Sequence, residues 1–502
     1  MVWLYGSEKV ELIILPGACQ RNRPCYRLEV LGNEGGIGVD FRDYTVVSLV
    51  EDVNHQKKSA VDLTKAALAN IERLNPTINA FCSHDSSAAL AEATRIDERI
   101  ANGERLPLAG IPIGVKDLED AKGFVTTFGS QMHVNDAPAT EDSILVHRLR
   151  EAGCVVLGKT NTPEFGFKGK TDNVPFGASC NPWNTGRTPG GSSGGTSAAL
   201  ASGMVPLATG SDGGGSIRIP AALCGLSGIK TSQGRVPNGG SKPPGSGLLT
   251  VKGPMTNRIR DAAYVLDQCM GEDPSDIFAL PKPTQAWHPQ LDGGLPDKIV
   301  WSSTMGITTV DKQILKACEK VIGQLADAGV EIIENEHIWS TNPFLSWLVF
   351  WTAARGRAQG HLRGTPEWQN IDADLRPQIE MGLDRFNAAD YASAIDMCHI
   401  LNLELETAFE SAPVILTPAT RGHAPKIVGD GWVDGEETPD WVAFTMGINM
   451  TRNPAGIVPI GLSDDGMPLG MQVLGRQLAD LTVLKTMAGM EDLLGFEEKA
   501  DI

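Results

Sequence analysis

The stretch Thr209–Ala221 reads TGSDGGGSIRIPA and places three consecutive glycines directly before a serine. Glycine in a helix or strand costs roughly 0.5–1 kcal/mol relative to alanine, so three in succession indicate a backbone that bends sharply or approaches another group closely. Upstream, Pro189–Gly195 reads PGGSSGG and frames a second serine with glycines. Two solvent-exposed turns would not require glycine beside both serines, so we interpret Ser192 and Ser216 as parts of one site.

The chain around these two loops is rich in small residues. Residues 182–247 are crowded with Gly, Ser and Pro, a composition that usually indicates a linker. Within them, however, TSAALASGMVPLATG (196–210) predicts a small-residue helix followed by an apolar strand, and ALCGLSGIK (222–230) is apolar as well. Small residues let backbones pack closely, so we expect this segment at the crowded centre of the fold.

Helical and strand-like segments alternate along the chain on both sides of this centre. A helical pattern over 60–74 is expected to end before Asn75-Pro76. The pattern predicts strands in AGIPIGVKD (109–117), CVVLGKT (154–160) and VEIIE (330–334), and helices in ILVHRLREAG (144–153) and DKQILKACEKVIGQLADAG (311–329). This alternation predicts an α/β fold with helices on the faces of a sheet.

The first forty residues contain two apolar runs, Val10–Leu15 and Tyr26–Leu31. They could form a hairpin, and they could equally belong to a loosely attached extension. The first twenty residues lack the basic region of a signal peptide, and Gly6–Lys9 and Glu11 interrupt their apolar stretch, so no signal peptide is expected. The chain has no stretch of about eighteen apolar residues, so no membrane span is predicted.

Composition narrows the class of partner. The chain has 502 residues, of which 41% are hydrophobic and 21% charged, and its net charge is −18. Such an acidic balance argues against nucleic acid or an anionic membrane as the main partner and favours a small neutral substrate. The nine cysteines are scattered without CxxC spacing, so neither a disulfide framework nor a zinc site is indicated, and a cytoplasmic location is expected.

One motif suggests nucleotide binding and is rejected on its context. Gly153–Thr160 matches the phosphate-loop pattern G-x-x-x-x-G-K-[ST] letter for letter. A phosphate loop needs flexible backbone between its glycines and a helix that begins at the lysine. Here the interval is CVVL, which is typical of a buried strand, and Asn-Thr-Pro follows the threonine. We therefore interpret this segment as a strand and its terminating turn.

A nucleophilic serine needs a base, because its hydroxyl is hardly ionised at neutral pH. The chain has no histidine between His147 and His288, and Ser216 does not match the G-x-S-x-G motif. Lys116 ends the apolar run GIPIGVK, where burial would lower its pKa and free the amine to accept a proton. From the residues alone, a surface lysine at the end of a strand is an equally good interpretation.

Longer motifs carry a family resemblance. They are GVKD (114–117), GKTNTPEF (158–165), RTPGGSSGGTSAALASG (187–203), ATGSDGGGSIRIPAALCGLSGIK (208–230), GPM (253–255), RNPAGIVPIG (452–461) and GMPLGMQVLGR (466–476). In this order they resemble the amidase signature family, with coverage from about Tyr44 to the C-terminus. The resemblance implies a catalytic domain over 43–502, with one large mixed sheet covered by helices on both faces. Residues 1–42 are then an N-terminal extension.

The resemblance also implies the catalytic residues. Ser216 would be the nucleophile, Ser192 a bridging serine after a cis peptide bond, and Lys116 the base. The backbone N–H groups of Gly213, Gly214, Gly215 and Ser216 would form the oxyanion hole, a preorganised set of donors of which one is typically worth about 10²–10³ in rate. No metal or cofactor would be needed. Asp212 and Arg218 would hold the loop.

The sequence says less about the substrate. Gly166 and Ser192 are expected to contact it, with Gly166 leaving a roomier acyl side. Phe165, Phe167 and Trp183 could form an apolar wall or belong to the core. Residues 339–396, which begin with WSTNPFLSWLVFWTAARG, are either a substrate channel or lid or a region of helix packing.

Three function classes follow from these observations. The first, which we favour, is a hydrolase of amide, carbamate or ester bonds in small apolar or aryl molecules, acting as a monomer or homodimer. The second is the glutamine-dependent amidotransferase subunit of tRNA-dependent amidation, which would need partner subunits. The third, a binding protein without activity, is disfavoured because all three residues of the implied triad are present.

Overall fold

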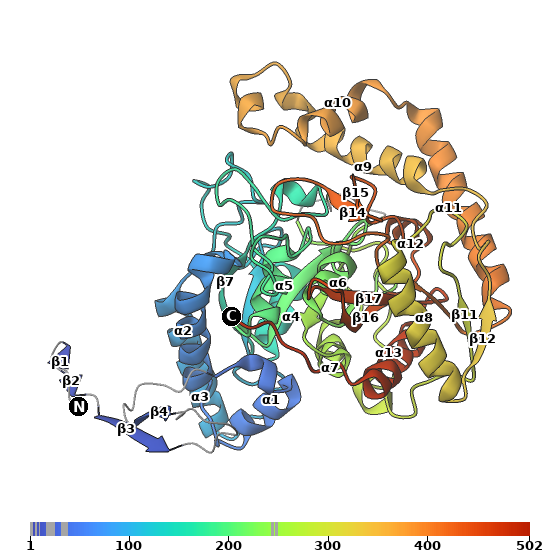
Figure 1. Cartoon of the computed structure of the whole chain (residues 1–502). Coiled ribbons are helices and arrows are strands. Elements are labelled where there is room, and N and C mark those ends of the chain that lie inside the picture. The colour runs from blue at the N-terminus through green and yellow to red at the C-terminus, as the bar shows by residue number, and fades with distance from the viewer. Residues whose placement is uncertain are drawn as a thin grey trace. The chain divides into compact units, whose positions relative to one another are not determined.

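The computed structural model describes residues 39–241, 245 and 249–502, together with the strand segments 4–5, 8–9, 11–16 and 26–31. The chain divides into two compact units, Met1–Val39 and Asp40–Ile502. In the first unit, β1 (Leu4–Tyr5) pairs with β2 (Glu8–Lys9), and β3 (Glu11–Pro16) pairs antiparallel with β4 (Tyr26–Leu31). The second pair is the hairpin that the sequence allowed (Figure 1).

The second unit contains two mixed sheets. The five-stranded sheet has the order β10 (Val251–Thr256), β8 (Leu207–Asp212), β6 (Pro112–Lys116), β7 (Val155–Thr160) and β5 (Phe81–His84). Its three inner strands run parallel, and its two outer strands pair antiparallel with them. Strands β6, β7 and β8 are buried throughout, as inner parallel strands usually are.

The six-stranded sheet has the order β12 (Glu331–Glu334), β11 (Lys298–Trp301), β13 (Val414–Pro418), β17 (Pro468–Gly475), β16 (Ala455–Leu462) and β9 (Gly228–Lys230). Strands β12, β11 and β13 are parallel, and the other pairings are antiparallel. A short hairpin of β14 (Gly431–Val433) and β15 (Glu436–Thr438) stands apart from both sheets.

The α/β fold with mixed sheets is as predicted, but the hydrogen bonding divides the expected single sheet into two. The facing edges are β9 and β10, which contact each other without forming a ladder. Strand β10 contains Pro254, which has no N–H to donate and is typical of an edge. The break therefore occurs where one candidate partner strand is very short and the other contains a proline.

Except in the segment 344–384, whose helices pack mainly on each other, helices pack around these sheets (Figure 1). They are α1 (Val46–Asn54), α2 (Ala60–Ile78), α3 (Ser86–Ala101), α4 (Ile144–Glu151), α5 (Gly194–Ala201), α6 (Arg218–Cys224), α7 (Ile259–Cys269), α8 (Lys312–Asp327), α9 (Phe344–Gln359), α10 (Arg376–Asp384), α11 (Ala388–Phe409), α12 (Met446–Thr451) and α13 (Asp480–Leu494). No helix among the described residues is both long and apolar enough to cross a membrane.

Helix α2 continues past the boundary that the sequence predicted. It includes Pro76 and ends at Asn79, whose backbone is left-handed with φ 52° and whose N–H donates to the Asn75 carbonyl. The Asn75 side chain bonds to both backbone groups of Phe81, at 2.7 and 2.9 Å. These bonds hold the last turn, so a proline near the helix end is tolerated although it lacks a donor.

The small-residue segment lies at the centre, as predicted. Every residue of α5 is buried, and the helix contacts β5, β6, β7, β8 and β10. A Cβ at Gly195 would overlap the backbone of Asn161 and Ala80. This close approach of backbones sets the start of α5 against the end of β7 and the start of β5.

The phosphate-loop interpretation is excluded by the same sheet. Residues Val155–Thr160 are strand β7, and Lys159 is fully buried. Its ammonium lies 3.4 Å from the Asp117 carboxylate and bonds to Thr126 Oγ1 at 2.9 Å. Lys159 is therefore held inside the protein by residues that follow β6.

Candidate active site

Lys116 ends β6 and is fully buried among three serines. Its Nζ lies 2.8 Å from Ser192 Oγ, 2.8 Å from Ser193 Oγ and 3.0 Å from Ser211 Oγ. The Gly191–Ser192 peptide bond is cis, as the resemblance implied. Lys116 and Ser192 were expected here from the sequence, whereas Ser193 and Ser211 were missed, although the first adjoins Ser192 and the second lies near the end of the strand before the glycine loop.

Burial lowers the pKa of Lys116 to about 7, although the charges of Asp212 and Glu119 act in the opposite direction. A low-dielectric environment disfavours the ammonium form, and neither carboxylate forms an ion pair with Nζ among the described residues. A substantial share of Lys116 is therefore uncharged at neutral pH and can accept a proton.

The surrounding serines determine where the lone pair of the neutral amine points. Ser193 Oγ lies 3.3 Å from the Ser211 carbonyl, to which its hydroxyl can donate, so it accepts from Lys116. Ser211 Oγ is the acceptor for the second N–H. A neutral lysine has two N–H groups and one lone pair, so the lone pair remains for the hydroxyl of Ser192.

The glycine loop after β8 is held by a buried ion pair. Arg218 and Asp212 are both fully buried, and the guanidinium donates to the two carboxylate oxygens at 2.9 and 3.0 Å. Burial alone would raise the pKa of Asp212, but the charge and hydrogen bonds of Arg218 hold it well below its usual range. The carboxylate also accepts the N–H groups of Gly215 and Ile217, so it fixes the turn around itself.

The carbonyl groups of this loop are also anchored, one after another. Asn449 Nδ2 donates to the Asp212 carbonyl at 2.9 Å, and Trp347 Nε1 donates to the Gly213 carbonyl at 2.9 Å. Thr445 Oγ1 donates to the Gly214 carbonyl at 2.6 Å, and the Ile219 N–H donates to the Gly215 carbonyl at 2.7 Å. In a trans peptide the following N–H points the opposite way. Anchoring the carbonyls therefore also orients the N–H groups of residues 213–216.

One expected oxyanion donor is occupied. The Gly215 N–H donates to Asp212 Oδ1 at 2.8 Å, because that ionised carboxylate is the strongest acceptor within reach. The N–H groups of Gly213, Gly214 and Ser216 have no acceptor among the described residues. We therefore correct the expectation for Gly215, which has φ 124° and serves the turn instead.

Ser192 and Ser216 line one cavity of about 450 Å³, the serine cavity, with Ser211, Gly213 and Gly166. The Ser193 N–H donates to the Ser216 carbonyl at 3.2 Å and ties the two loops together. Within the described part of the chain no hydrogen bond joins the hydroxyls of Ser192 and Ser216. Catalytic hydrogen bonds are often long without substrate, so this separation does not exclude proton transfer between them.

Two aromatic rings form one wall of the serine cavity. Phe128 and Phe165 stack at 6.0 Å, and the Phe165 N–H donates to the Phe128 carbonyl at 2.7 Å. Both have left-handed backbone, with φ 55° and 51°, which is unusual for bulky residues and is found mostly at functional sites. Phe165 was expected in this wall, whereas Phe128 was missed because the sequence around it has no recognisable motif.

Phe167 and Trp183, for which the sequence left a wall and a core position open, lie outside this wall, and Phe167 belongs to the core. Phe167 packs with Ile371, Leu375 and Ile379 in a separate core cluster, and Trp183 lines a second cavity. Gly166 does line the serine cavity, but a Cβ there would come within 2.8 Å of Leu118 Cδ1 and 3.1 Å of Ser192 Oγ. Its φ of 70° also favours glycine. Gly166 thus permits close approach to Ser192 and does not leave extra room on the acyl side.

Helix α9, from the segment that was expected to be a channel or to pack as helices, reaches the serine cavity. Trp347 makes the bond to Gly213 described above, and its ring stacks on Trp351 at 5.0 Å. Trp351 and Arg355 line the cavity, and Arg355 lies over the Trp351 ring at 4.4 Å. The sequence indicated the aromatic character of this helix but not which turn faces the serines.

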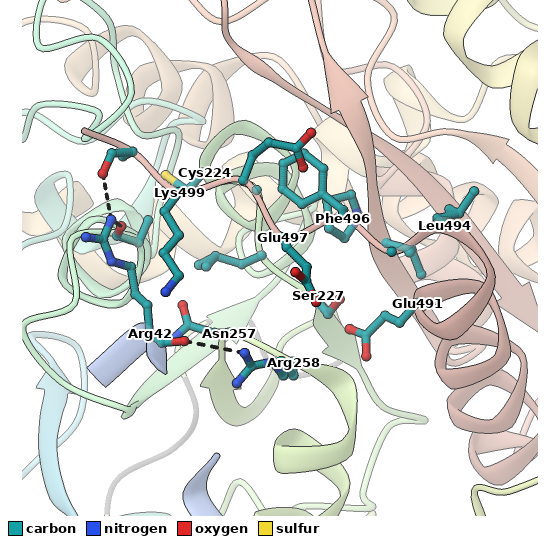
Figure 2. A pocket seen from close by; sticks show the side chains of 18 of the residues that line it. Arg42, Cys224, Ser227, Asn257, Arg258, Glu491, Leu494, Phe496, Glu497 and Lys499 are labelled. Atoms are coloured by element: carbon teal, nitrogen blue, oxygen red, sulfur yellow. Dashed lines mark hydrogen bonds between the residues drawn. The ribbon is translucent and has the colours of Figure 1, made fainter. Parts of the chain in front are cut away.

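The second cavity, of about 580 Å³, lies beneath the C-terminal residues and contains none of the predicted catalytic residues (Figure 2). Arg42 and Arg258 enter it from distant parts of the chain, and Arg42 Nη1 donates to the Ala500 carbonyl at 2.7 Å. Glu491 accepts the Ile259 N–H at 2.9 Å. These charged groups hold the C-terminal segment to the body of the unit.

Comparison with known proteins agrees with this geometry. The family model described as Amidase matches residues 62–484. An acylamidase of Rhodococcus erythropolis is 32% identical over 91% of this chain and 96% of its own, and a glutamyl-tRNA(Gln) amidotransferase subunit of Desulforapulum autotrophicum is 33% identical over 86% and 94%. The structure of a bacterial aryl acylamidase of the amidase signature family has a TM-score of 0.84 at 27% identity, covering 90% of this chain and 96% of that one. The chain therefore belongs to the amidase signature family and is a hydrolase of carbon–nitrogen bonds.

Proposed function

We propose that this enzyme hydrolyses amide bonds of small molecules with an aryl or apolar group, through an acyl-enzyme on Ser216. The observation that carries the proposal is the buried amine of Lys116, with a pKa near 7 and Nζ 2.8 Å from Ser192 Oγ, beside a cavity that also holds Ser216. A base of this pKa matches neutral pH, as general base catalysis requires.

In the proposed mechanism the proton moves from Ser216 to Ser192 and from Ser192 to the neutral Lys116. Ser216 Oγ bonds to the substrate carbonyl carbon, and the resulting oxyanion accepts hydrogen bonds from the N–H groups of Gly213, Gly214 and Ser216. The C–N bond then breaks as the relay returns the proton to the leaving amine. Water attacks the acyl-enzyme by the same relay and releases the acid, which restores Ser216.

The cavity wall supports the proposed substrate class. Phe128, Phe165 and Trp351 offer aromatic surface beside the serines, which suits an aryl or apolar acyl group. Carbamates and esters present a carbonyl of the same geometry to the oxyanion donors, so aryl carbamates and aryl esters are included. A carbamoyl group transferred to Ser216 would give carbon dioxide and an amine after hydrolysis.

A second candidate is the amidotransferase subunit, which releases ammonia from glutamine. It is favoured by one observation, since relatives of that name match this chain at the same level of identity as the acylamidase. It predicts a preference for glutamine that appears only with partner subunits.

The decisive experiment combines a substrate panel with the mass of the intact protein. Anilides, fatty-acid amides, primary amides, aryl carbamates and glutamine are compared with the isolated chain, and the adduct is trapped at short times. Ser216→Ala should lose both the adduct and turnover of an anilide. Ser202→Ala, which removes a buried hydroxyl from the end of α5, should retain both. Turnover by a folded Ser216→Ala variant, or activity on glutamine alone, would contradict the proposal.

A further inference from the structure

Arg355 is a buried cation that forms no ion pair with any residue that the structure describes. Its side chain is 7% exposed and lines the serine cavity, yet none of the carboxylates in the described ranges pairs with it and no acceptor there bonds to its guanidinium. Burial lowers its pKa to about 10, so it remains charged at neutral pH. Its Nε atom is shielded from solvent and has no hydrogen-bond partner in these ranges, whereas buried polar and charged groups in proteins are normally paired.

The residues one turn before and one turn after Arg355 repeat this pattern. Trp351, Arg355 and Gln359 follow each other at four-residue spacing on α9, so they share one face of the helix. All three line the serine cavity, and all three have a buried polar atom without a hydrogen-bond partner: Nε1, Nε and Oε1, respectively. Buried polar groups are usually satisfied, and three exceptions on one face point to a missing ligand.

The acidic residues around the cavity do not neutralise Arg355. Glu119 pairs with Lys252 at 3.0 Å, and Asp142 pairs with Arg150 at 3.2 Å. Burial lowers the pKa of Arg355, and no ion pair joins its guanidinium to a carboxylate in the described ranges. The positive charge is therefore left for a group that enters the cavity.

We propose that the substrate carries one carboxylate and that Arg355 binds it. The Nε2 group of Gln359 can donate a second hydrogen bond to that carboxylate, whereas Gln359 Oε1 is an acceptor and would take an N–H or O–H of the substrate. This inference rests on the proposed hydrolysis and names its substrate class more closely: an amide that bears a single carboxylate at the end remote from the scissile bond. The planar guanidinium offers paired donors that match a carboxylate. The flat face of the same group stays on Trp351, which keeps it in place.

The chemistry favours a monoanion over a dianion or a neutral group. Three cations of the described residues line the cavity, but Lys252 already pairs with Glu119, so a dianion would have only Arg355 and the exposed Arg357 among them to balance it beside carboxylates such as Glu141. A neutral acceptor would leave the charge of Arg355 uncompensated. The net charge of −18 favoured a neutral substrate. The electric field of that net charge acts over long distances and is screened by salt, whereas a direct contact between a carboxylate and Arg355 is screened much less.

The test uses matched substrate pairs that differ only in the charge of the remote group. On the acyl side, glutaryl 4-nitroanilide is compared with its methyl ester. On the amine side, 4-(butanoylamino)benzoate is compared with its methyl ester. In each case the amine released by cleavage of the amide bond is measured. The full chain should prefer the carboxylate member of at least one pair by about tenfold or more in kcat/KM, the usual value of a charged hydrogen bond.

Three variants then locate the preference. Arg355→Met keeps apolar contact with Trp351 and should abolish the preference through KM, while kcat for the neutral ester changes little. Arg355→Lys keeps the charge without the paired donors and should retain only part of the preference. Arg385→Met removes the same charge from an exposed position at the end of α10, which does not line the serine cavity, and should keep the preference.

The outcomes separate this inference from the proposed function. Turnover of neutral amides by Arg355→Met with no carboxylate preference supports both proposals. A wild-type enzyme that hydrolyses the neutral members but prefers neither carboxylate overturns the role of Arg355 and leaves the hydrolase intact. A preference that survives in folded Arg355→Met also overturns it. If Arg355→Met does not fold, Arg355→Lys and the wild-type pairs decide the question.

Discussion

A lysine amine acts as a base only when it is uncharged, and Lys116 meets this condition through burial. Ser193 and Ser211 then orient the amine so that its lone pair faces Ser192. Lys230 is the useful contrast: burial also lowers its pKa to about 7, but its Nζ donates to the Thr231 carbonyl and contacts no serine hydroxyl in the described residues. A lowered pKa alone therefore does not define the base.

Activity should depend on pH through Lys116. Because its folded pKa lies near 7, the neutral form dominates above that value and the ammonium form below it. We expect kcat/KM for an anilide to fall about tenfold per pH unit below about 6.5 and to level off above about 7.5. Lys116→Met should lose amide turnover by several orders of magnitude. Lys230→Met serves as the control and should show the same fall in kcat/KM at acidic pH as the unaltered enzyme. A rate independent of pH from about 5 to about 9 would contradict the assignment of Lys116.

At the scale of single residues, the sequence predicted positions better than it predicted contacts. It singled out Lys116, Ser192 and Ser216 as candidates because glycines and a strand end mark them, and the structure places Lys116 against Ser192 and both serines on one cavity. It could not assign the Gly215 N–H to Asp212, because that bond depends on how the turn closes around the carboxylate. It also gave no reason to single out Arg355, whose significance lies in the partners that it lacks within the described part of the chain.

At the scale of elements, α9 connects the wall of the serine cavity to the glycine loop after β8. The stacked rings of Trp347 and Trp351 lie between Arg355 and the carbonyl of Gly213. A Cβ at Gly214 would come within 2.7 Å of the Trp347 ring, so the loop and the helix are in direct contact. The position of α9 therefore contributes to the direction of the Gly214 N–H.

This contact leads to a prediction for Trp347. Trp347→Phe keeps an aromatic ring but removes the Nε1 donor to Gly213, which should loosen the peptide that carries the Gly214 N–H. We expect kcat to fall about tenfold with KM changed less than about twofold, since a weakened oxyanion donor acts mainly in the transition state.

The matched control for Trp347→Phe is Trp183→Phe. That variant also loses an indole bond to a carbonyl, here Cys224 at 3.0 Å, but away from the serine cavity. It should leave kcat unchanged. Equal losses in both variants, or a loss of Trp347→Phe confined to KM, would contradict the positioning role.

The elements themselves were largely predictable, since apolar periodicity marked β6, β7, α4 and α8. The exceptions have local causes. Helix α2 passes Pro76 because side-chain bonds of Asn75 hold its end, and the sheet divides because Pro254 forms part of an edge. Neither the side-chain bonds nor the pairing of distant strands can be deduced from a window of sequence.

At the scale of the whole molecule, the boundary of the catalytic unit can be tested by shortening the chain. The contacts of Arg42 with Asp40, Ala201 and Ala500 belong to the unit that begins at Asp40. We propose that the residues before Asp40 are not needed for chemistry. A chain that begins at Asp40 should keep kcat/KM within about twofold and keep its melting temperature.

A chain that begins at Asp43 is the informative comparison, because it lacks Arg42 and its bonds to both the body and the C-terminal segment. It should melt several degrees lower, as expected from the loss of hydrogen bonds made by a charged group. Loss of activity in a folded chain that begins at Asp40 would show instead that the first unit contributes to the site.

Stability should also depend on pH through the second cavity. Burial raises the pKa of Glu491 to about 7, so the folded state holds this proton up to that pH, whereas the unfolded chain releases it near 4.5. The folded state therefore loses stability as pH rises from about 4.5 to about 7. Glu491→Gln should remove this loss and stabilise the protein at pH 8 by about 1–3 kcal/mol.

The same substitution should have little effect at pH 5, where the carboxyl is largely protonated in the folded state. Thermal or urea unfolding at pH 5 and pH 8 measures the difference, and the exposed Glu498→Gln is the control. A gain that is equal at both pH values would mean that packing, and not ionisation, is responsible.

The row of side chains along α9 has a consequence for how this enzyme could be altered. The proposed catalytic groups lie at the end of β6 and on two loops next to the sheet, whereas the proposed recognition group lies on a separate helix, one turn beyond the Trp347–Trp351 stack. An engineer could therefore randomise positions 355 and 359 while keeping both tryptophans, and so change which remote group is accepted without redesigning the catalytic machinery. In evolution, the same arrangement would let one ancestral scaffold acquire new substrates through a few changes on one helical face.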